Sequence, residues 1–76
     1  MPKAPRITGG KAVSAFCQAG FVVTRIKGSH HILKHPEKPG IRLSIPVHDP
    51  DTVGVGLLCK QISLAGLTIE QFIGYL

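Results

Sequence analysis

Residues 21–45 read FVVTRIKGSHHILKHPEKPGIRLSI, and this stretch decides the fold of the chain. Residues 21–26 are mostly β-branched or aromatic, which suits a strand, and a tight turn through Gly28 leads into a second strand at about 29–35. A proline- and glycine-rich turn follows, and residues 41–45 alternate apolar and polar side chains as a half-buried third strand does. Because parallel strands need long crossover connections, the three strands are predicted to form an antiparallel meander.

The segment before the sheet has the pattern of a capped amphipathic helix. Thr8 can cap its start, and Gly20 can end it in the left-handed conformation. The apolar residues between them are expected to form the stripe that faces the core: Ala12, Val13, Phe16 and Cys17. Cys17 is therefore expected to be a buried, inert thiol.

Two more helices are predicted after the sheet. An amphipathic helix begins at about Leu57 and ends at Gly66, and Thr68 then starts a short terminal helix with a Thr-Ile-Glu-Gln capping box. The stripe of the terminal helix that is expected to be buried consists of Ile69, Phe72, Ile73 and Leu76. The chain is therefore expected to have an α+β fold of order α-β-β-β-α with a short extra helix, in which the helices cover one face of a three-stranded antiparallel sheet.

Length and composition restrict the class of protein. The chain has 76 residues, of which 43% are hydrophobic, so we expect one folded domain over residues 1–76 and no intrinsic disorder. No apolar stretch approaches the roughly 20 residues of a transmembrane helix, and residues 1–6 lack the apolar region of a secretory signal. The two cysteines, Cys17 and Cys59, are too few for a disulfide framework. The expected location is the cytoplasm.

Basic residues are concentrated in the first part of the chain. Residues 1–42 hold eight Lys and Arg against one Glu, which is +7, and residues 43–76 hold one Lys against three acids, which is −2. The whole chain carries +5. A basic half on a small domain indicates either a nucleic-acid partner or a role in solubility alone, and charge by itself favours neither.

Histidine is the unusual residue of this sequence, with His30, His31, His35 and His48 in one short chain. Histidine titrates near neutral pH, so it can take a proton from a ribose 2′-hydroxyl or give one to a leaving 5′-oxygen. Lys27 and Lys34 lie on either side of the His30-His31 pair, where they could hold a phosphate. In a strand the paired histidines point to opposite faces, so at most one lies at the site and the other packs or stays at the surface.

The other two histidines are interpreted as structural residues. His35 before Pro36 is interpreted as strand-end polarity, and His48 as a residue of a surface loop. A metal site is not favoured, because adjacent His30 and His31 cannot easily converge on one ion and no carboxylate or cysteine completes a ligand set at usable spacing.

Four motifs follow one another over about residues 6–73. They are Gly20-Phe21, Lys27-Gly28-Ser29-His30-His31-Ile32, Ile45-Pro46-Val47-His48, and a Gly-Leu-Leu helix that closes in Leu64-Ala65-Gly66-Leu67-Thr68 and Glu70-Gln71-Phe72. In this order they resemble the motifs of the HicA toxins, the small messenger-RNA interferases of HicA–HicB toxin–antitoxin systems. The resemblance implies a double-stranded-RNA-binding-domain-like fold, metal-independent RNA cleavage by one histidine of a Gly-Ser-His motif with no cofactor, and neutralisation by a HicB antitoxin.

By this resemblance the motif histidine falls on His30, with His31 as the alternative because family members differ in which position holds it. Gly28 and Ser29 match the motif turn, and His48 matches a Pro-x-His segment with a supporting or structural role. One segment departs from the family pattern. Where Gly-Thr-Leu and basic residues are usual, residues 56–60 read Gly-Leu-Leu-Cys-Lys, which carries less positive charge.

The leading hypothesis is a ribonuclease in which His30 acts as the general base. Lys27 and Lys34 would hold phosphate, and Arg25 and Arg42 on the neighbouring strands would extend the RNA-binding surface. Two other hypotheses remain. One is a non-catalytic RNA-binding module of the double-stranded-RNA-binding type, and the other is a protein-interaction module whose main contact is its antitoxin.

Overall fold

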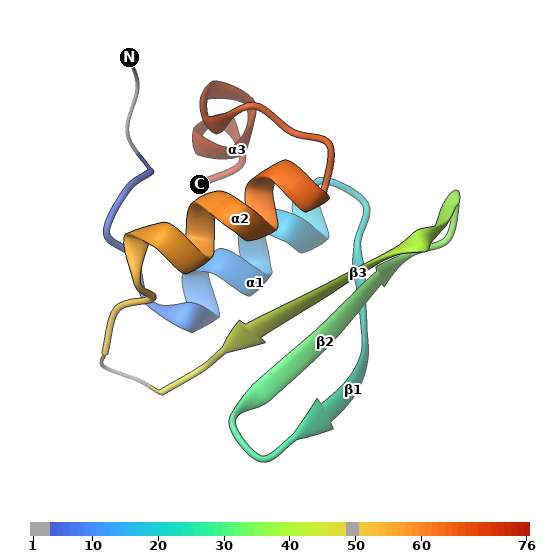
Figure 1. The fold of residues 1–76 in the computed structure, drawn as a ribbon, viewed down its shortest axis with the longest axis horizontal. Helices are drawn as coiled ribbons and strands as arrows, with labels where there is room; N and C mark the ends of the chain where they lie inside the picture. The colour runs from blue at the N-terminus through green and yellow to red at the C-terminus, as the bar shows by residue number, and fades with distance from the viewer. Residues whose placement is uncertain (1–3, 49–50) are drawn as a thin grey trace.

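The computed structural model describes residues 4–48 and 51–76 and consists of three helices and a three-stranded sheet (Figure 1). Three antiparallel strands follow the first helix, and two helices close the chain, so the predicted α+β order is confirmed. The elements are α1 (Gly9–Gln18), β1 (Val22–Lys27), β2 (His30–His35), β3 (Lys38–Pro46), α2 (Val55–Leu64) and α3 (Ile69–Gly74).

The sheet is the predicted meander, with strand order β1-β2-β3. Gly28 turns the chain between β1 and β2 with a φ of 61°, a left-handed conformation that glycine adopts without steric cost. The third strand is longer than predicted and begins at Lys38 rather than at residue 41. Pro39 looked like a turn residue, but β3 is an edge strand, where the missing N–H of a proline can face away from the ladder.

A β-bulge in β1 changes which side chains share a face. Val23 is paired with Leu33, whereas Arg25 is paired with Ile32, so Thr24 is the extra residue between two registers. Without the bulge, Val23 and Arg25 would point to the same face of the sheet, because side chains alternate along a strand. With it, Val23 packs toward the core and Arg25 points to the opposite face.

All three helices lie on one face of the sheet, and the core lies between the two layers (Figure 1). Phe16 of α1 is at its centre, with ring centroids 5.9 Å from Phe21 and 4.9 Å from Phe72. From the sheet, Leu33, Leu43 and Ile45 are fully buried against the helices. Alternate residues of β2 and β3 therefore hold the helices, and the residues between them are left for the other face.

Helix ends follow the sequence signals. The hydroxyl of Thr8 accepts a hydrogen bond from the Lys11 amide, and Gly20 follows α1 with a φ of 104°. At α3 both bonds of the predicted capping box are present, between Thr68 and Gln71. The α2 helix begins at Val55, two residues before the predicted start.

The apolar stripes of α1 and α3 are narrower than predicted. Cys17 is exposed, which contradicts its expected burial, and the buried stripe of α1 instead follows Ala12, Ala15 and Phe16. In α3 only Phe72 is buried; Ile73 is 42% exposed, and Leu76, which lies beyond the end of the helix, is 52% exposed. Each helix packs against the core over a narrow arc, so an apolar residue just outside the arc remains in contact with solvent.

Gln61 is the one polar side chain of the described residues that is buried, and it joins α2 to β3. Its Oε1 accepts a hydrogen bond of 3.1 Å from the backbone amide of Ser44. Because β3 is an edge strand, this bond satisfies a backbone donor that has no further strand beside it.

The helices are short. The longest two, α1 and α2, have ten residues each, and none of those described is long and apolar enough to cross a membrane.

Candidate functional site

The strand register places the paired histidines on opposite faces of the sheet, as predicted. His31 is paired with Ile26 on one side and with Ile45 on the other, and Ile45 is fully buried under the helices. Directly paired residues point to the same face, so His31 lies on the helix-covered face. His30, paired with Lys27 and Pro46, lies on the face that the helices leave uncovered, which we call the open face.

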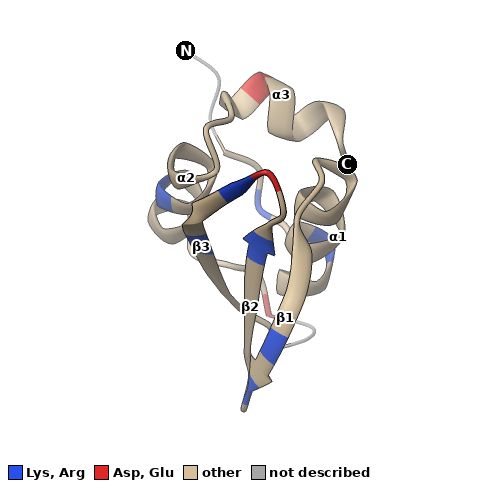
Figure 2. Ribbon diagram, turned by 90° about the vertical axis from the view of Figure 1, so that its right-hand side faces the viewer, with Lys and Arg blue, Asp and Glu red and all other residues tan. Residues whose placement is uncertain are grey.

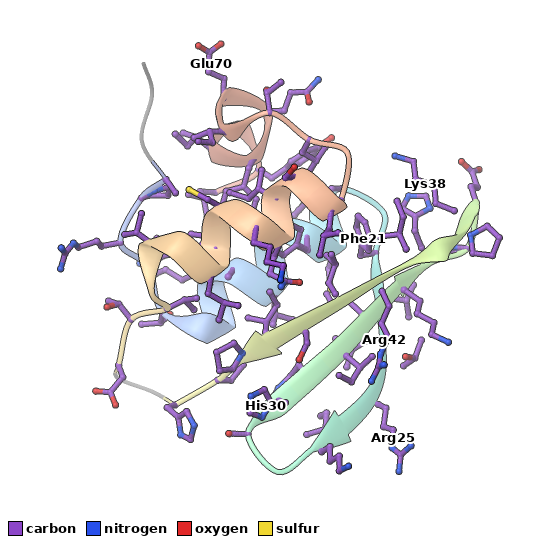
Figure 3. The ribbon with its side chains drawn as sticks, in the orientation of Figure 1. Phe21, Arg25, His30, Lys38, Arg42 and Glu70 are labelled. Carbon is purple, nitrogen blue, oxygen red and sulfur yellow. The ribbon has the colours of Figure 1, made fainter. Side chains whose placement is uncertain are left out.

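The four basic residues of the predicted RNA-binding surface meet on this open face. Lys27 is paired with His30, and Arg25 is paired with Ile32 one step further along the strands. Lys34 and Arg42 face each other across β2 and β3 another step along. Figure 2, which looks toward the sheet, shows basic positions on all three strands, and Figure 3 shows Arg25, His30 and Arg42 on the part of the molecule away from the helices.

Two adjacent hollows of about 450 and 490 Å³ lie on the open face. The first is lined by Arg25, Lys27, His30, Ile32, Arg42 and Ser44. The second shares three of these residues and adds Thr24 and Lys34. No acidic side chain belongs to either lining, and all four basic residues are exposed. Such a surface has a positive potential and suits a polyanion backbone.

Ser29, which precedes His30, connects the β1–β2 turn to the segment after β3. Its Oγ lies 2.8 Å from Nε2 of His48, and its carbonyl oxygen accepts a 2.7 Å hydrogen bond from the Val47 amide. The same segment is packed against the start of α1, because a Cβ on Gly9 would overlap the carbonyl oxygen of Pro46 and lie 2.8 Å from Cα of Val47. His48 is exposed, and its side chain contacts Ser29, the residue directly before β2.

Sequence reasoning did not predict this contact between Ser29 and His48. It follows from the register of β2 and β3. His30 pairs with Pro46, and beyond this pair the Val47 amide donates one more backbone hydrogen bond to Ser29. Which residue 19 positions away lies beside Ser29 cannot be read from the chain alone, and His48 lies outside the predicted strands.

The other two histidines face the interior side of the sheet. His31 is half-buried, and its Nδ1 is buried without a hydrogen-bond partner among the described residues. His35 packs edge-on against Phe21 at 5.0 Å, and its Nδ1 accepts a 3.1 Å hydrogen bond from the Glu37 amide. His35 was interpreted from the sequence as a polar residue at a strand end. In the structure it packs against the core and also holds the β2–β3 turn.

Metal-ligating residues do not gather anywhere in the parts of the chain that the structure describes. No group of three or more His, Cys, Asp or Glu side chains is placed to hold an ion there. Both cysteines are free thiols, with Cys17 exposed and Cys59 half-buried.

A family model described as "HicA toxin of bacterial toxin-antitoxin" matches residues 9–67 of the 76. The chain belongs to the HicA toxin family. It is therefore a toxin of a toxin–antitoxin system, as the motif resemblance implied. A comparison with curated proteins finds no match. The HicA match includes α1, the whole sheet and α2, and so contains both the open face and the Ser29–His48 contact.

Residues 56–60, which depart from the HicA pattern, lie on α2 and not on the open face. Leu58 is fully buried, Leu57 is 37% exposed, and Lys60 is exposed. The reduced charge of this segment leaves the basic residues around His30 unchanged, because the helices lie on the other face of the sheet.

Proposed function

We propose that this HicA toxin is a metal-independent endoribonuclease, an mRNA interferase, with His30 as its general base. One observation supports the choice of histidine above all others. His30 shares its face and its hollow with Arg25, Lys27 and Arg42, whereas His31 is on the helix-covered face. The toxin would act on messenger RNA in the cytoplasm and be neutralised by a HicB-like antitoxin.

The reaction is a transfer of the phosphoryl group within the RNA. His30 removes the proton from a ribose 2′-hydroxyl, the 2′-oxygen forms a bond to the adjacent phosphorus, and the bond from phosphorus to the 5′-oxygen breaks. Water or another group gives the leaving 5′-oxygen a proton. The products are a 2′,3′-cyclic phosphate and a 5′-hydroxyl. General-base help of this kind contributes about 10²–10⁴-fold to the rate.

Four positive charges assist the reaction by binding and by electrostatics. Lys27 is the direct cross-strand neighbour of His30, so its ammonium group is suited to the phosphate that reacts. Arg25, Lys34 and Arg42 lie further along the strands and are suited to neighbouring phosphates. Gly28 and Ser29 form the turn that presents His30 at the end of this surface.

The test is RNA cleavage by purified protein in EDTA, compared for the wild type, His30→Ala and His31→Ala. We expect cleavage by the wild type, a loss of about 10²-fold or more in His30→Ala, and retained cleavage in His31→Ala. His31 is the matched control because it is the adjacent residue of the same type on the opposite face. An inactive wild type, or equal activity in all three proteins, would contradict the proposal.

A second candidate function, a non-catalytic RNA-binding module, is favoured by the four exposed basic residues that have no acidic neighbour in the linings of the two hollows. This surface would bind RNA phosphates whether or not a reaction follows. RNA binding by the wild type that weakens steeply with salt, without any cleavage product, would favour this function over the ribonuclease.

A further inference from the structure

We propose that His48 is a second catalytic histidine, the general acid that gives a proton to the leaving 5′-oxygen. This inference rests on the ribonuclease function proposed for His30. The family resemblance implies only a supporting or structural role for His48, whereas its placement beside the start of β2 supports a direct part in the chemistry.

Three contacts hold His48 at the end of the sheet where His30 begins β2. Its Nε2 lies 2.8 Å from Oγ of Ser29, the residue directly before His30. The Val47 amide donates a 2.7 Å hydrogen bond to the carbonyl of the same serine. His30 itself is paired with Pro46, two residues before His48. Both imidazoles are therefore held at the end of the sheet where β2 begins, and Gly9 packs against the connecting backbone at Pro46.

The bond to Ser29 leaves the other ring nitrogen of His48 available to substrate. His48 is exposed, and among the described residues no group forms a hydrogen bond with its Nδ1. In the protonated ring both nitrogens carry a hydrogen, so Nε2–H donates to the serine hydroxyl and Nδ1–H is free to donate outward. After the Nδ1 proton is transferred, Nε2–H still donates to Ser29, so the ring keeps its orientation through the reaction.

The proposed mechanism requires such an acid. When the 2′-oxygen attacks phosphorus, the 5′-oxygen leaves with the electron pair of the broken P–O bond and needs a proton to become a hydroxyl. His30 accepts the 2′-hydroxyl proton, and Nδ1 of His48 donates one to the 5′-oxygen, so the step balances without another reactant. Proton exchange with water then restores both histidines.

The remaining two histidines are excluded by their surroundings. His31 lies on the helix-covered face beside Ile45. His35 uses its Nδ1 for the Glu37 amide, and its ring packs against Phe21. Of the four histidines, His48 is thus the one besides His30 that has both an exposed ring and a contact at the β1–β2 turn.

The experiment compares two RNA oligonucleotides of one sequence, cut by the wild type, His30→Ala and His48→Gln. One is ordinary RNA, and the other has sulfur in place of the 5′-oxygen at the mapped cleavage position. A thiol has a pKa of about 8.5 and leaves as a thiolate without needing a proton. We expect His48→Gln to slow cleavage of ordinary RNA about 10²-fold or more but to slow cleavage of the sulfur-containing RNA by less than about 10-fold. His30→Ala should slow both.

A pH profile provides the second readout. The wild-type rate should fall at high pH, where an acid catalyst has lost its proton, and His48→Gln should lose this fall on the ordinary RNA. Ser29→Ala retains the acid but removes its hydrogen bond, so we expect a smaller loss that is again selective for ordinary RNA. An unchanged melting temperature of His48→Gln would show that folding is intact, as expected for an exposed residue.

Three results would overturn the inference. Equal losses of His48→Gln on both RNAs would show that His48 is a positioning residue and not the acid. Unchanged rates of His48→Gln on both would show that His48 takes no part in the reaction. If the wild type cuts and His30→Ala does not, either of these results overturns only the role of His48. A wild type that cuts neither RNA would overturn the proposed ribonuclease function and this inference together.

Discussion

Lys34 and Arg42 are direct cross-strand partners on the open face, so two positive side chains face each other across β2 and β3. Like charges in such a pair repel and reduce the stability of a sheet. No acid belongs to the linings of the two hollows beside them. The two charges therefore destabilise the isolated protein. A polyanion on this face would offset their repulsion by attracting both, which is the arrangement expected of a ligand-binding surface.

The repulsion predicts that Arg42→Gln stabilises the free protein. Removing one of the two charges should raise the free energy of unfolding by a few tenths of a kcal/mol at low salt, and the gain should shrink as salt screens the pair. Urea unfolding at two salt concentrations measures it. Lys60→Gln on α2 removes an exposed charge away from this face and serves as the control, with a change within about 0.5 kcal/mol. A destabilised Arg42→Gln would contradict the interpretation.

The same substitution should weaken RNA binding in a way that salt reveals. If Arg42 contacts one phosphate, Arg42→Gln lowers the slope of log affinity against log salt by about 1. Fluorescence titrations of a labelled, non-cleavable RNA at several salt concentrations give the slope. The slope of Lys60→Gln should equal that of the wild type, and a normal slope for Arg42→Gln would place the RNA elsewhere on the molecule.

The contact between α1 and the end of β3 predicts that Gly9→Ala is destabilising. Its new Cβ would overlap the Pro46 carbonyl, which is backbone and cannot rotate away, so a loss of about 1–3 kcal/mol is expected. Gly56→Ala is the matched control. Position 56 also lies in a helix but has nothing within 4 Å of an added Cβ, so a neutral or stabilising change of up to about 1 kcal/mol is expected. Thermal unfolding of both variants decides whether the close packing at Pro46 exists.

Gln61 gives a prediction about the edge of the sheet. In Gln61→Leu the Ser44 amide loses its acceptor, and an unpaired backbone donor costs about 1–3 kcal/mol. Hydrogen exchange at Ser44 should become faster than in the wild type by more than the global change in stability explains. Ser63→Ala, at an exposed position of the same helix, should leave that exchange rate unchanged. Equal protection of Ser44 in Gln61→Leu would show that the side chain does not hold this amide.

Local signals were sufficient to predict much of the architecture. Helix ends depend on single residues with a fixed local geometry, and Thr8, Gly20 and Thr68 all act as expected. The opposite orientation of His30 and His31 follows from the alternation of side chains along a strand.

Features that depend on distant partners could not be predicted in this way. The bulge at Thr24 turns Arg25 to the open face, but an extra residue in one strand is recognised only when its pairing partner is known. The contact of Ser29 with His48 likewise depends on how the ends of β2 and β3 meet. Apolar spacing assigned Cys17 to the buried stripe, but Cys17 is exposed, because the width of that stripe depends on what packs against α1.

Along β2 the even-numbered residues from His30 to Lys34 face the open side, and the odd-numbered residues from His31 to His35 face the helices. Under the proposed function, substitutions at the exposed even positions, His30 and Lys34, can therefore alter RNA recognition while the packing beneath stays the same. An insertion or deletion of one residue in β2 would exchange the two sets, bring Leu33 into water and turn His30 inward. This strand can therefore evolve by replacement of residues, whereas a change in its length would remove folding and recognition together.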